Sequence, residues 1–153
     1  MNEAFRSEIW QKYWVPSISE WSRAESSVES ICRIFAENGI TSGKVLDLCC
    51  GTGRLSIWLA KKGFTAVGLD ISSLYLEDAR KRACEYGVES KVKFYLGDMR
   101  NVDDVVGLES PFDCVISFRN SIGFWGDKGD EMMFAKVRRM TKKGGVLLIG
   151  ECD

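Results

Sequence analysis

The segment 45–56, VLDLCCGTGRLS, constrains the fold more than any other part of the chain. Residues 45–48, VLDL, are mainly apolar and predict a short buried strand, and a turn with two glycines, Gly51 and Gly53, follows it. Because glycine has no Cβ, such a turn can take backbone angles closed to other residues and can let a ligand approach closely. A helix then begins, with its free N–H groups directed at that ligand. The apolar face of this helix carries Leu55, Trp58 and Leu59. Strand, turn and helix together predict a nucleotide-binding site.

The spacing inside this turn distinguishes two classes of nucleotide ligand. A dinucleotide fingerprint needs glycine or alanine three residues after Gly53, and Ser56 stands there instead. The stretch from Asp47 to Gly53, DLCCGTG, resembles motif I of the class I S-adenosylmethionine-dependent methyltransferases, which usually reads DLGCGTG. Cys49 takes the place of the first glycine of that motif. If this position needs a positive φ, we expect Cys49 to be strained, although cysteine is small enough not to block the ligand.

Apolar runs and helical spacings alternate along the rest of the chain. Helices are predicted from a capping box at 26–29, from Ser72 or Ser73, weakly at 103–108, and from Asp127 or Asp130 to a basic last turn at 142–143. Further strands are predicted at 64–70, 91–96, 112–118 and 146–149. The alternation indicates an α/β fold with a Rossmann-like, doubly wound, mainly parallel sheet of at least five strands and helices on both faces. Ligands of such sheets bind at the carboxyl ends of the strands, where the strand order reverses.

Composition excludes several classes of protein. The chain has 153 residues, 45% of them hydrophobic, a net charge of −1 and no basic block. These values fit one globular domain and argue against a nucleic-acid partner. No run of about 18 apolar residues and no signal-peptide core occur, so we expect a cytoplasmic protein without a membrane partner. Histidine is absent and the six cysteines show no C-x-x-C spacing, so we expect buried thiols and no metal centre.

Two acidic residues follow the next predicted strands. Asp70 ends the strand at 64–70, where a carboxylate can accept both hydroxyls of a ribose, and Asp98 follows the strand at 91–96. A helix-capping or turn aspartate is the structural alternative at each position. The methyltransferase resemblance implies that Asp70 binds the ribose, that Asp98 accepts the adenine amino group and that Met99 lies against the ring. The cofactor residues implied by the resemblance are Asp47, Cys49, Gly51, Gly53, Asp70, Ile71, Asp98, Met99 and Ser117.

Two aromatic segments are candidates for binding the methyl acceptor. Segment 118–125, FRNSIGFW, follows the fourth predicted strand and is similar to the N-S-x-G-aromatic loop of small-molecule methyltransferases. It differs from the D/N-P-P-Y/F loop of enzymes that methylate a flipped base. Residues 1–24 are rich in aromatics, and the resemblance implies a helical cover on a cofactor-binding core at 25–153. Simple packing is the alternative for both segments. The tentative acceptor-binding residues are Tyr13, Trp14, Asn120 and Phe124.

The motifs together resemble those of an S-adenosylmethionine-dependent methyltransferase that acts on a small molecule by direct in-line transfer and releases S-adenosylhomocysteine. The sequence does not identify the acceptor or a catalytic residue. Without histidine, a carboxylate, Tyr13 or solvent must take any proton from the acceptor. One alternative is a module that binds the cofactor but is inactive or depends on a partner. A nucleotide-dependent dehydrogenase is a weaker alternative, opposed by Ser56 and Asp98.

The resemblance also predicts two more strands after the fifth, whereas the sequence ends at Asp153. We therefore expect a fragment or a natural short form, with an exposed edge on the strand at 146–149. Pairing of a second copy at that edge predicts a homodimer. The aromatic N-terminal segment folding across the edge is the alternative.

Overall fold

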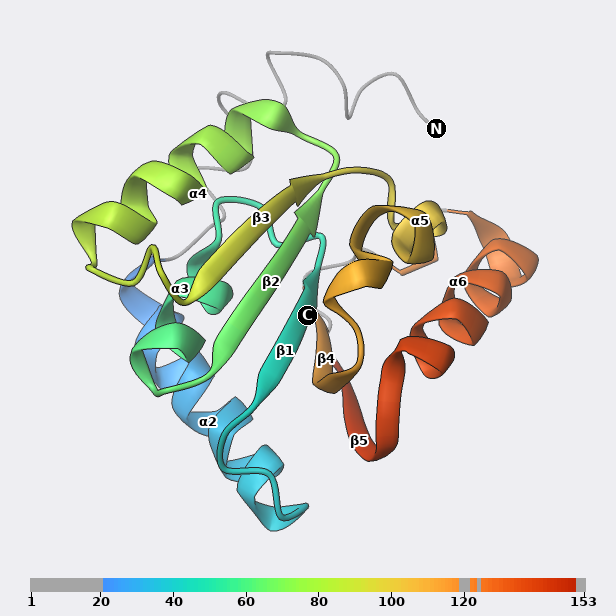
Figure 1. Ribbon diagram of the computed structural model, residues 1–153, viewed down its shortest axis with the longest axis horizontal. Helices are drawn as coiled ribbons and strands as arrows, with labels where there is room; N and C mark the ends of the chain where they lie inside the picture. The colour runs from blue at the N-terminus through green and yellow to red at the C-terminus, as the bar shows by residue number, and fades with distance from the viewer. Residues whose placement is uncertain (1–20, 119–121, 124, 151–153) are drawn as a thin grey trace.

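The computed structural model describes residues 21–118, 122–123 and 125–150. Five strands form one sheet in the spatial order β3-β2-β1-β4-β5 (Figure 1). The strands are β1 (Lys44–Leu48), β2 (Thr65–Asp70), β3 (Val92–Leu96), β4 (Phe112–Phe118) and β5 (Thr141–Gly150). Every neighbouring pair is parallel. The Rossmann-like parallel sheet predicted from the alternating pattern is confirmed.

Helices cover both faces of this sheet (Figure 1). The α-helices are α2 (Ala24–Glu37), α3 (Arg54–Lys61), α4 (Ser73–Glu85), α5 (Val102–Val106) and α6 (Gly126–Met140). Three short 3-10 turns accompany them, η3 (Trp21–Arg23), η4 (Met99–Asn101) and η5 (Gly107–Glu109). Apolar side chains of α2, α3 and α4 are buried against one face, and those of α5 and α6 against the other. The sheet is therefore doubly wound, as expected.

Strand β1 is the buried centre of the sheet and lies where the strand order reverses. Val45, Leu46 and Leu48 are fully buried, because helices cover both faces of the strand. Side chains alternate between the faces along a strand. Leu46 and Leu48 accordingly pack in the cluster with α5 and α6, while Val45 packs in the cluster with α2 and α3. The carboxyl end of β1 thus lies between those of β2 and β4.

The start of α2 differs from the prediction. The capping box at 26–29 predicted a helix that begins at Ser26, but α2 begins at Ala24. The Ser26 and Ser27 hydroxyls donate to the Arg23 carbonyl oxygen from within the first turn, at 3.1 and 2.8 Å. Ala24 is fully buried, and η3 leads directly into the helix. Packing of Ala24 against the core thus outweighs the local capping signal.

The boundary between α6 and β5 also differs. Met133, Val137 and Met140 are buried on one face of α6, as predicted. The basic pair Lys142 and Lys143, however, belongs to β5 and not to the last helical turn. The Lys142 Nζ donates to Asp113 Oδ1 of β4 at 2.7 Å, which holds this part of the chain against the neighbouring strand. A register shift between β4 and β5 extends the strand back to Thr141.

Strand β5 forms an edge of the sheet. Within the described part of the chain it pairs with β4 alone. Leu147 and Ile149 are each 41% exposed, whereas Val146 and Leu148 pack against the core on the other face. The expected exposure of this strand is present among the described residues. Pairing with a second copy stays a prediction.

Two other expectations concern the aromatic N-terminal segment and membrane-spanning helices. Residues 1–20, which include most of the predicted aromatic cover, lie outside the described residues. Among the helices that are described, none combines the length and the apolar character that crossing a bilayer requires.

Candidate cofactor-binding site

The glycine turn after β1 has the backbone conformation that its sequence predicts. Gly51 has φ 55° and Gly53 has φ 73°, both in the left-handed region that favours glycine. A Cβ at Gly51 would meet nothing within 4 Å, so the turn offers an open approach there. A Cβ at Gly53 would lie 2.7 Å from Phe94 Cζ and 3.0 Å from Ala79 Cβ. Gly51 therefore suits the approach of a ligand, while Gly53 permits close packing at the start of α3.

Cys49 occupies a left-handed position, with φ 59°. The expectation of strain at this residue is confirmed, because a left-handed conformation costs a residue with a Cβ about 1 kcal/mol or more. Its thiol donates to Met99 Sδ at 3.4 Å. Cys49 therefore connects the glycine turn to the turn after β3. Its neighbour Cys50 is buried, and the five described cysteines form no disulfide with one another.

Asp47 is a buried acid beneath the turn. It is 3% exposed and accepts a hydrogen bond from the Ser56 hydroxyl at 2.6 Å. Burial raises the pKa of Asp47 to about 7, although the hydrogen bond from Ser56 and the charge of Arg54 act in the opposite direction. In the sequence, Ser56 served only to exclude a dinucleotide fingerprint. The structure gives it Asp47 as a partner, nine residues earlier on another element, which no sequence spacing indicates.

The raised pKa of Asp47 predicts a pH-dependent stability. A folded-state pKa of about 7 lies above the ordinary value of 3.8. The folded protein therefore holds this proton more tightly than the unfolded chain does. The resulting stabilisation is complete below the ordinary pKa and is lost as the pH rises to about 7. Urea unfolding should show that the stability of the wild type relative to Asp47→Asn falls by about 2 kcal/mol between about pH 5 and pH 7.

The control for this measurement is Ser56→Ala, which removes the hydrogen bond that lowers the pKa of Asp47. In this variant the loss of stability should extend to higher pH. Parallel pH curves for the wild type and Asp47→Asn would contradict the prediction.

Asp70 joins the glycine turn to the end of β2. The residue is buried, with 8% of its surface exposed. Oδ2 accepts from the Gly51 N–H at 2.8 Å, and Oδ1 accepts from the Ser72 N–H at 2.9 Å. Burial raises the pKa of Asp70, while these backbone hydrogen bonds oppose that effect. Ser72 in turn accepts from the Tyr75 N–H and caps α4, as predicted. The ribose contact of Asp70 stays a prediction, and the sequence did not reveal its hydrogen bond from the Gly51 N–H.

The end of β2 adjoins the end of β3. Asp70 is the register partner of Leu96, and both Leu96 and Ile71 are exposed apolar residues. The Asp98 Oδ1 accepts from the Arg100 N–H at 2.9 Å, which is the turn geometry weighed as an alternative in the sequence. Met99 is buried in the core beneath this turn. The adenine contact of Asp98 stays a prediction, and Leu96 and Arg100 are neighbours that the sequence did not single out.

Ser117 lies at the carboxyl end of β4, beside Leu48 of β1 in the sheet register. It is 1% exposed, and its hydroxyl has no hydrogen-bond partner among the described residues. A buried hydroxyl without a partner is unfavourable unless a ligand or water satisfies it. Ser117 therefore fits a position beside a polar ligand. The tentative acceptor residues Tyr13, Trp14, Asn120 and Phe124 lie outside the described residues.

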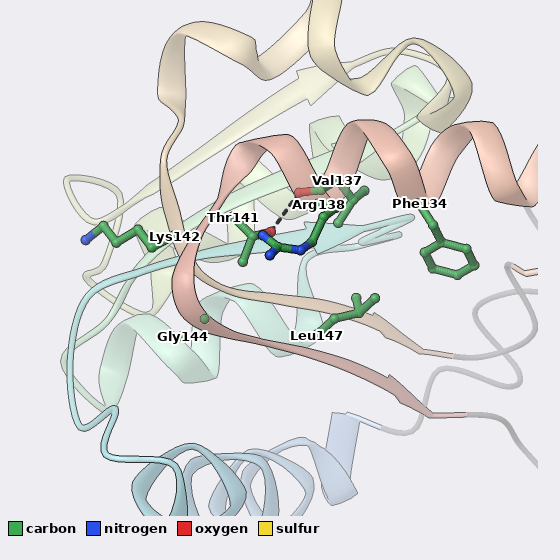
Figure 2. A pocket seen from close by; sticks show the side chains of 8 residues that line it. Phe134, Val137, Arg138, Thr141, Lys142, Gly144 and Leu147 are labelled. Atoms are coloured by element: carbon green, nitrogen blue, oxygen red, sulfur yellow. Dashed lines mark hydrogen bonds between the residues drawn. The ribbon is translucent and has the colours of Figure 1, made fainter.

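The predicted cofactor residues that the structure describes thus lie together at the carboxyl ends of four adjacent strands, β3, β2, β1 and β4. A groove of about 210 Å³ lies elsewhere, between α6 and the first half of β5. Figure 2 shows Phe134 and Leu147 pointing into this groove, near the hydrogen bond from Thr141 to Val137. It is nearer the amino ends of the strands and contains none of the predicted site residues. Within the described ranges, no three His, Cys, Asp or Glu side chains gather as metal ligands would.

The strand order, the glycine turn and the acids after β2 and β3 define a Rossmann-like nucleotide-binding protein. Residues 45–145 match the family model described as a methyltransferase domain. Since this match covers more than half of the sequence, the chain belongs to the methyltransferase domain family. The predicted family is confirmed.

Individual proteins agree with this assignment. The chain is 36% identical over 107 residues to the YqeM protein of Bacillus subtilis (strain 168), covering 69% of this chain and 41% of that protein. It shares the fold of a S-adenosylmethionine-dependent methyltransferase from Clostridium acetobutylicum ATCC 824, with TM-score 0.72, 24% identity and coverage of 91% and 53%. It also resembles the glycopeptide N-methyltransferase MtfA complexed with (S)-adenosyl-L-methionine, with TM-score 0.64, 31% identity and coverage of 78% and 52%. The chain spans about half the length of these proteins.

Proposed function

We propose that this chain transfers a methyl group from S-adenosylmethionine to a small-molecule acceptor. The observation that carries the proposal is the convergence of Asp47, Asp70 and Asp98 with the open glycine turn at one sheet edge. The partnerless, buried hydroxyl of Ser117 supports a polar ligand there. The absence of a basic block in the sequence favours a small acceptor over a nucleic acid.

The residues of this edge fit the parts of the cofactor. Each oxygen of the Asp70 carboxylate has two lone pairs, and one backbone N–H is bound to each oxygen. The Ile71 N–H also acts on this carboxylate, so of its four lone pairs about one is left for a ribose hydroxyl. We expect Asp98, which Arg100 contacts, to accept from the adenine amino group, with Ile71 and Leu96 as exposed apolar neighbours of the ring. The open space above Gly51 lets the rest of the cofactor lie close to the backbone.

The cofactor supplies a sulfonium methyl that is already an activated electrophile. The protein therefore acts mainly by binding, by orienting donor and acceptor in line and by excluding water. The acids at the strand ends fix the cofactor, and the sequence after β4 supplies the candidates for contacting the acceptor.

Calorimetry of ligand binding tests this proposal. S-adenosylmethionine and S-adenosylhomocysteine should bind saturably, and NAD should show no comparable binding. S-inosylhomocysteine has an oxygen in place of the adenine amino group, so it should bind about tenfold or more weakly than S-adenosylhomocysteine. Equal affinity for NAD and S-adenosylhomocysteine would contradict the proposal that S-adenosylmethionine is the methyl donor.

Turnover distinguishes an enzyme from a module that only binds the cofactor. The chain is incubated with methyl-labelled S-adenosylmethionine and pools of small amines, alcohols and thiols, and labelled product is counted. Formation of labelled product together with S-adenosylhomocysteine is the expected result, and a chelator should leave its rate unchanged. Tight binding without turnover in every pool would favour the binding module.

A further inference from the structure

A single cation connects Asp98 to the chain segment that precedes α6. The Arg100 guanidinium donates from Nε to Asp98 Oδ1 at 3.0 Å and from Nη2 to Asp98 Oδ2 at 2.6 Å. The same guanidinium lies over the ring of Trp125, with its central carbon 3.9 Å from the ring centroid. A cation at this distance from an indole face is attracted to it. Arg100 therefore contacts both the proposed adenine-binding acid and the acceptor side of the site.

The acceptor capacity of Asp98 is fully used. A carboxylate offers about four lone-pair positions. Arg100 directs four hydrogen-bond contacts at them, namely its backbone N–H and Nε on Oδ1, and Nε and Nη2 on Oδ2. A further donor, such as the amino group of adenine, can bind Asp98 only if Arg100 releases or shares one of these contacts. Binding at Asp98 must therefore change how the guanidinium lies over Trp125.

The surroundings favour transmission of such a change. Trp125 and Ile122 pack against the core cluster that contains Met99. The Gly123 N–H donates to Asp130 Oδ2 of α6 at 2.8 Å, which ties the residues before α6 to that helix. The Lys136 Nζ donates to the Arg100 carbonyl oxygen at 2.8 Å, so the Arg100 backbone is also fixed to α6. The Arg100 backbone is thus held in place, so a shift of the guanidinium changes its contact with Trp125 and is passed to the backbone beside that ring.

We propose that Arg100 is a positioning residue that couples occupancy of the adenine position at Asp98 to Trp125, directly before α6. The inference rests on the proposed function, because it requires adenine at Asp98. Coupling between two sites is reciprocal, so an acceptor that holds Trp125 in its shifted position should also tighten cofactor binding. The contact of Arg100 with Trp125 thus links the cofactor position at Asp98 to the expected acceptor position.

Hydrogen exchange of peptides that contain segment 122–126 tests the coupling. In the wild type, saturating S-adenosylhomocysteine should change the exchange rate of this segment by about fivefold or more. S-inosylhomocysteine at saturation should produce little change, because it has no amino group for Asp98. Arg100→Met should still bind S-adenosylhomocysteine but lose the response in the segment. Trp125→Leu should lose the response in the same way, and Trp125→Phe, which keeps an aromatic face, should retain part of it.

The outcomes separate this inference from the proposed function. If S-adenosylhomocysteine binds to the wild type and to Arg100→Met, and the segment responds equally in both, the coupling role of Arg100 is wrong while the function stands. If S-inosylhomocysteine changes hydrogen exchange as much as S-adenosylhomocysteine does, the coupling role of Arg100 is also wrong while the function stands. Failure of the wild type to bind S-adenosylhomocysteine in calorimetry overturns both.

Discussion

Replacement of Asp70 by alanine should weaken binding of S-adenosylhomocysteine by about 1.5 to 3 kcal/mol, or roughly 10 to 150-fold, through loss of a charge-assisted hydrogen bond to the ribose. The same change should lower the free energy of unfolding. It leaves the Gly51 and Ser72 N–H groups without their acceptor, at about 1 to 3 kcal/mol for each group that stays buried. Calorimetry measures the first effect, and urea unfolding the second.

Two further variants separate these effects. Asp70→Asn keeps one acceptor oxygen and loses the charge. Its affinity for S-adenosylhomocysteine and its free energy of unfolding should therefore lie between those of Asp70→Ala and the wild type. Ser72→Ala removes the cap that accepts from the Tyr75 N–H but keeps the Asp70 carboxylate. It should cost about 0.5 to 2 kcal/mol of stability with little change in affinity. Equal affinity of the wild type and Asp70→Ala would exclude Asp70 from the site.

Gly53→Ala should be the most destabilising single change in the glycine turn. The added Cβ would be 2.7 Å from Phe94 Cζ, and the left-handed φ of 73° adds backbone strain. Overpacking costs about 1 to 3 kcal/mol and left-handed backbone about 1 to 2, so the free energy of unfolding should fall by about 2 to 5 kcal/mol. Urea unfolding of the wild type and the variant measures this difference, from the transition midpoint and the slope of the transition.

Gly51→Ala is the matched control. Its φ of 55° is also left-handed, but its Cβ would meet nothing within 4 Å. Only the backbone strain of about 1 to 2 kcal/mol should appear in stability. Ligand affinity should fall in this variant, because the methyl group occupies the open approach to the turn. Equal destabilisation by the two substitutions would contradict the packing assigned to Gly53.

The parts of the fold that the sequence predicts are those in which local pattern and burial agree. The strand at 112–118 has its predicted bounds because its apolar residues Phe112 and 114–116 are buried, as a strand covered on both faces requires. The cap at Ser72 was predicted because its signal coincides with the start of the buried face of α4. At Ser26 the two signals conflict, and the burial of Ala24 outweighs the cap.

The parts of the site that were missed depend on contacts between distant residues or on short turns. Asp70 reaches Gly51 across two strand ends, which no local spacing reveals. Arg100 pairs with Asp98 two residues earlier, a separation that does not bring side chains together on a helix, and the two residues lie in a short turn and not in a strand. Gly68 gives no sequence signal at all. A Cβ there would lie 2.7 Å from Cys50 Sγ, so the close packing beneath the turn depends on it.

The order of strands also implies an order of assembly in time. The pairs β1 with β2 and β2 with β3 join strands that are neighbours in sequence. β1 meets β4 only after the chain has passed through β2, α4, β3 and α5. Pairing across a long intervening segment must overcome a large loop-closure entropy, so it forms late during folding. The three acids lie in or beside the strands that pair before that step, whereas Ser117 reaches its place beside β1 through that step. A folding chain should therefore form the edge that holds the cofactor before it completes the side that receives the acceptor.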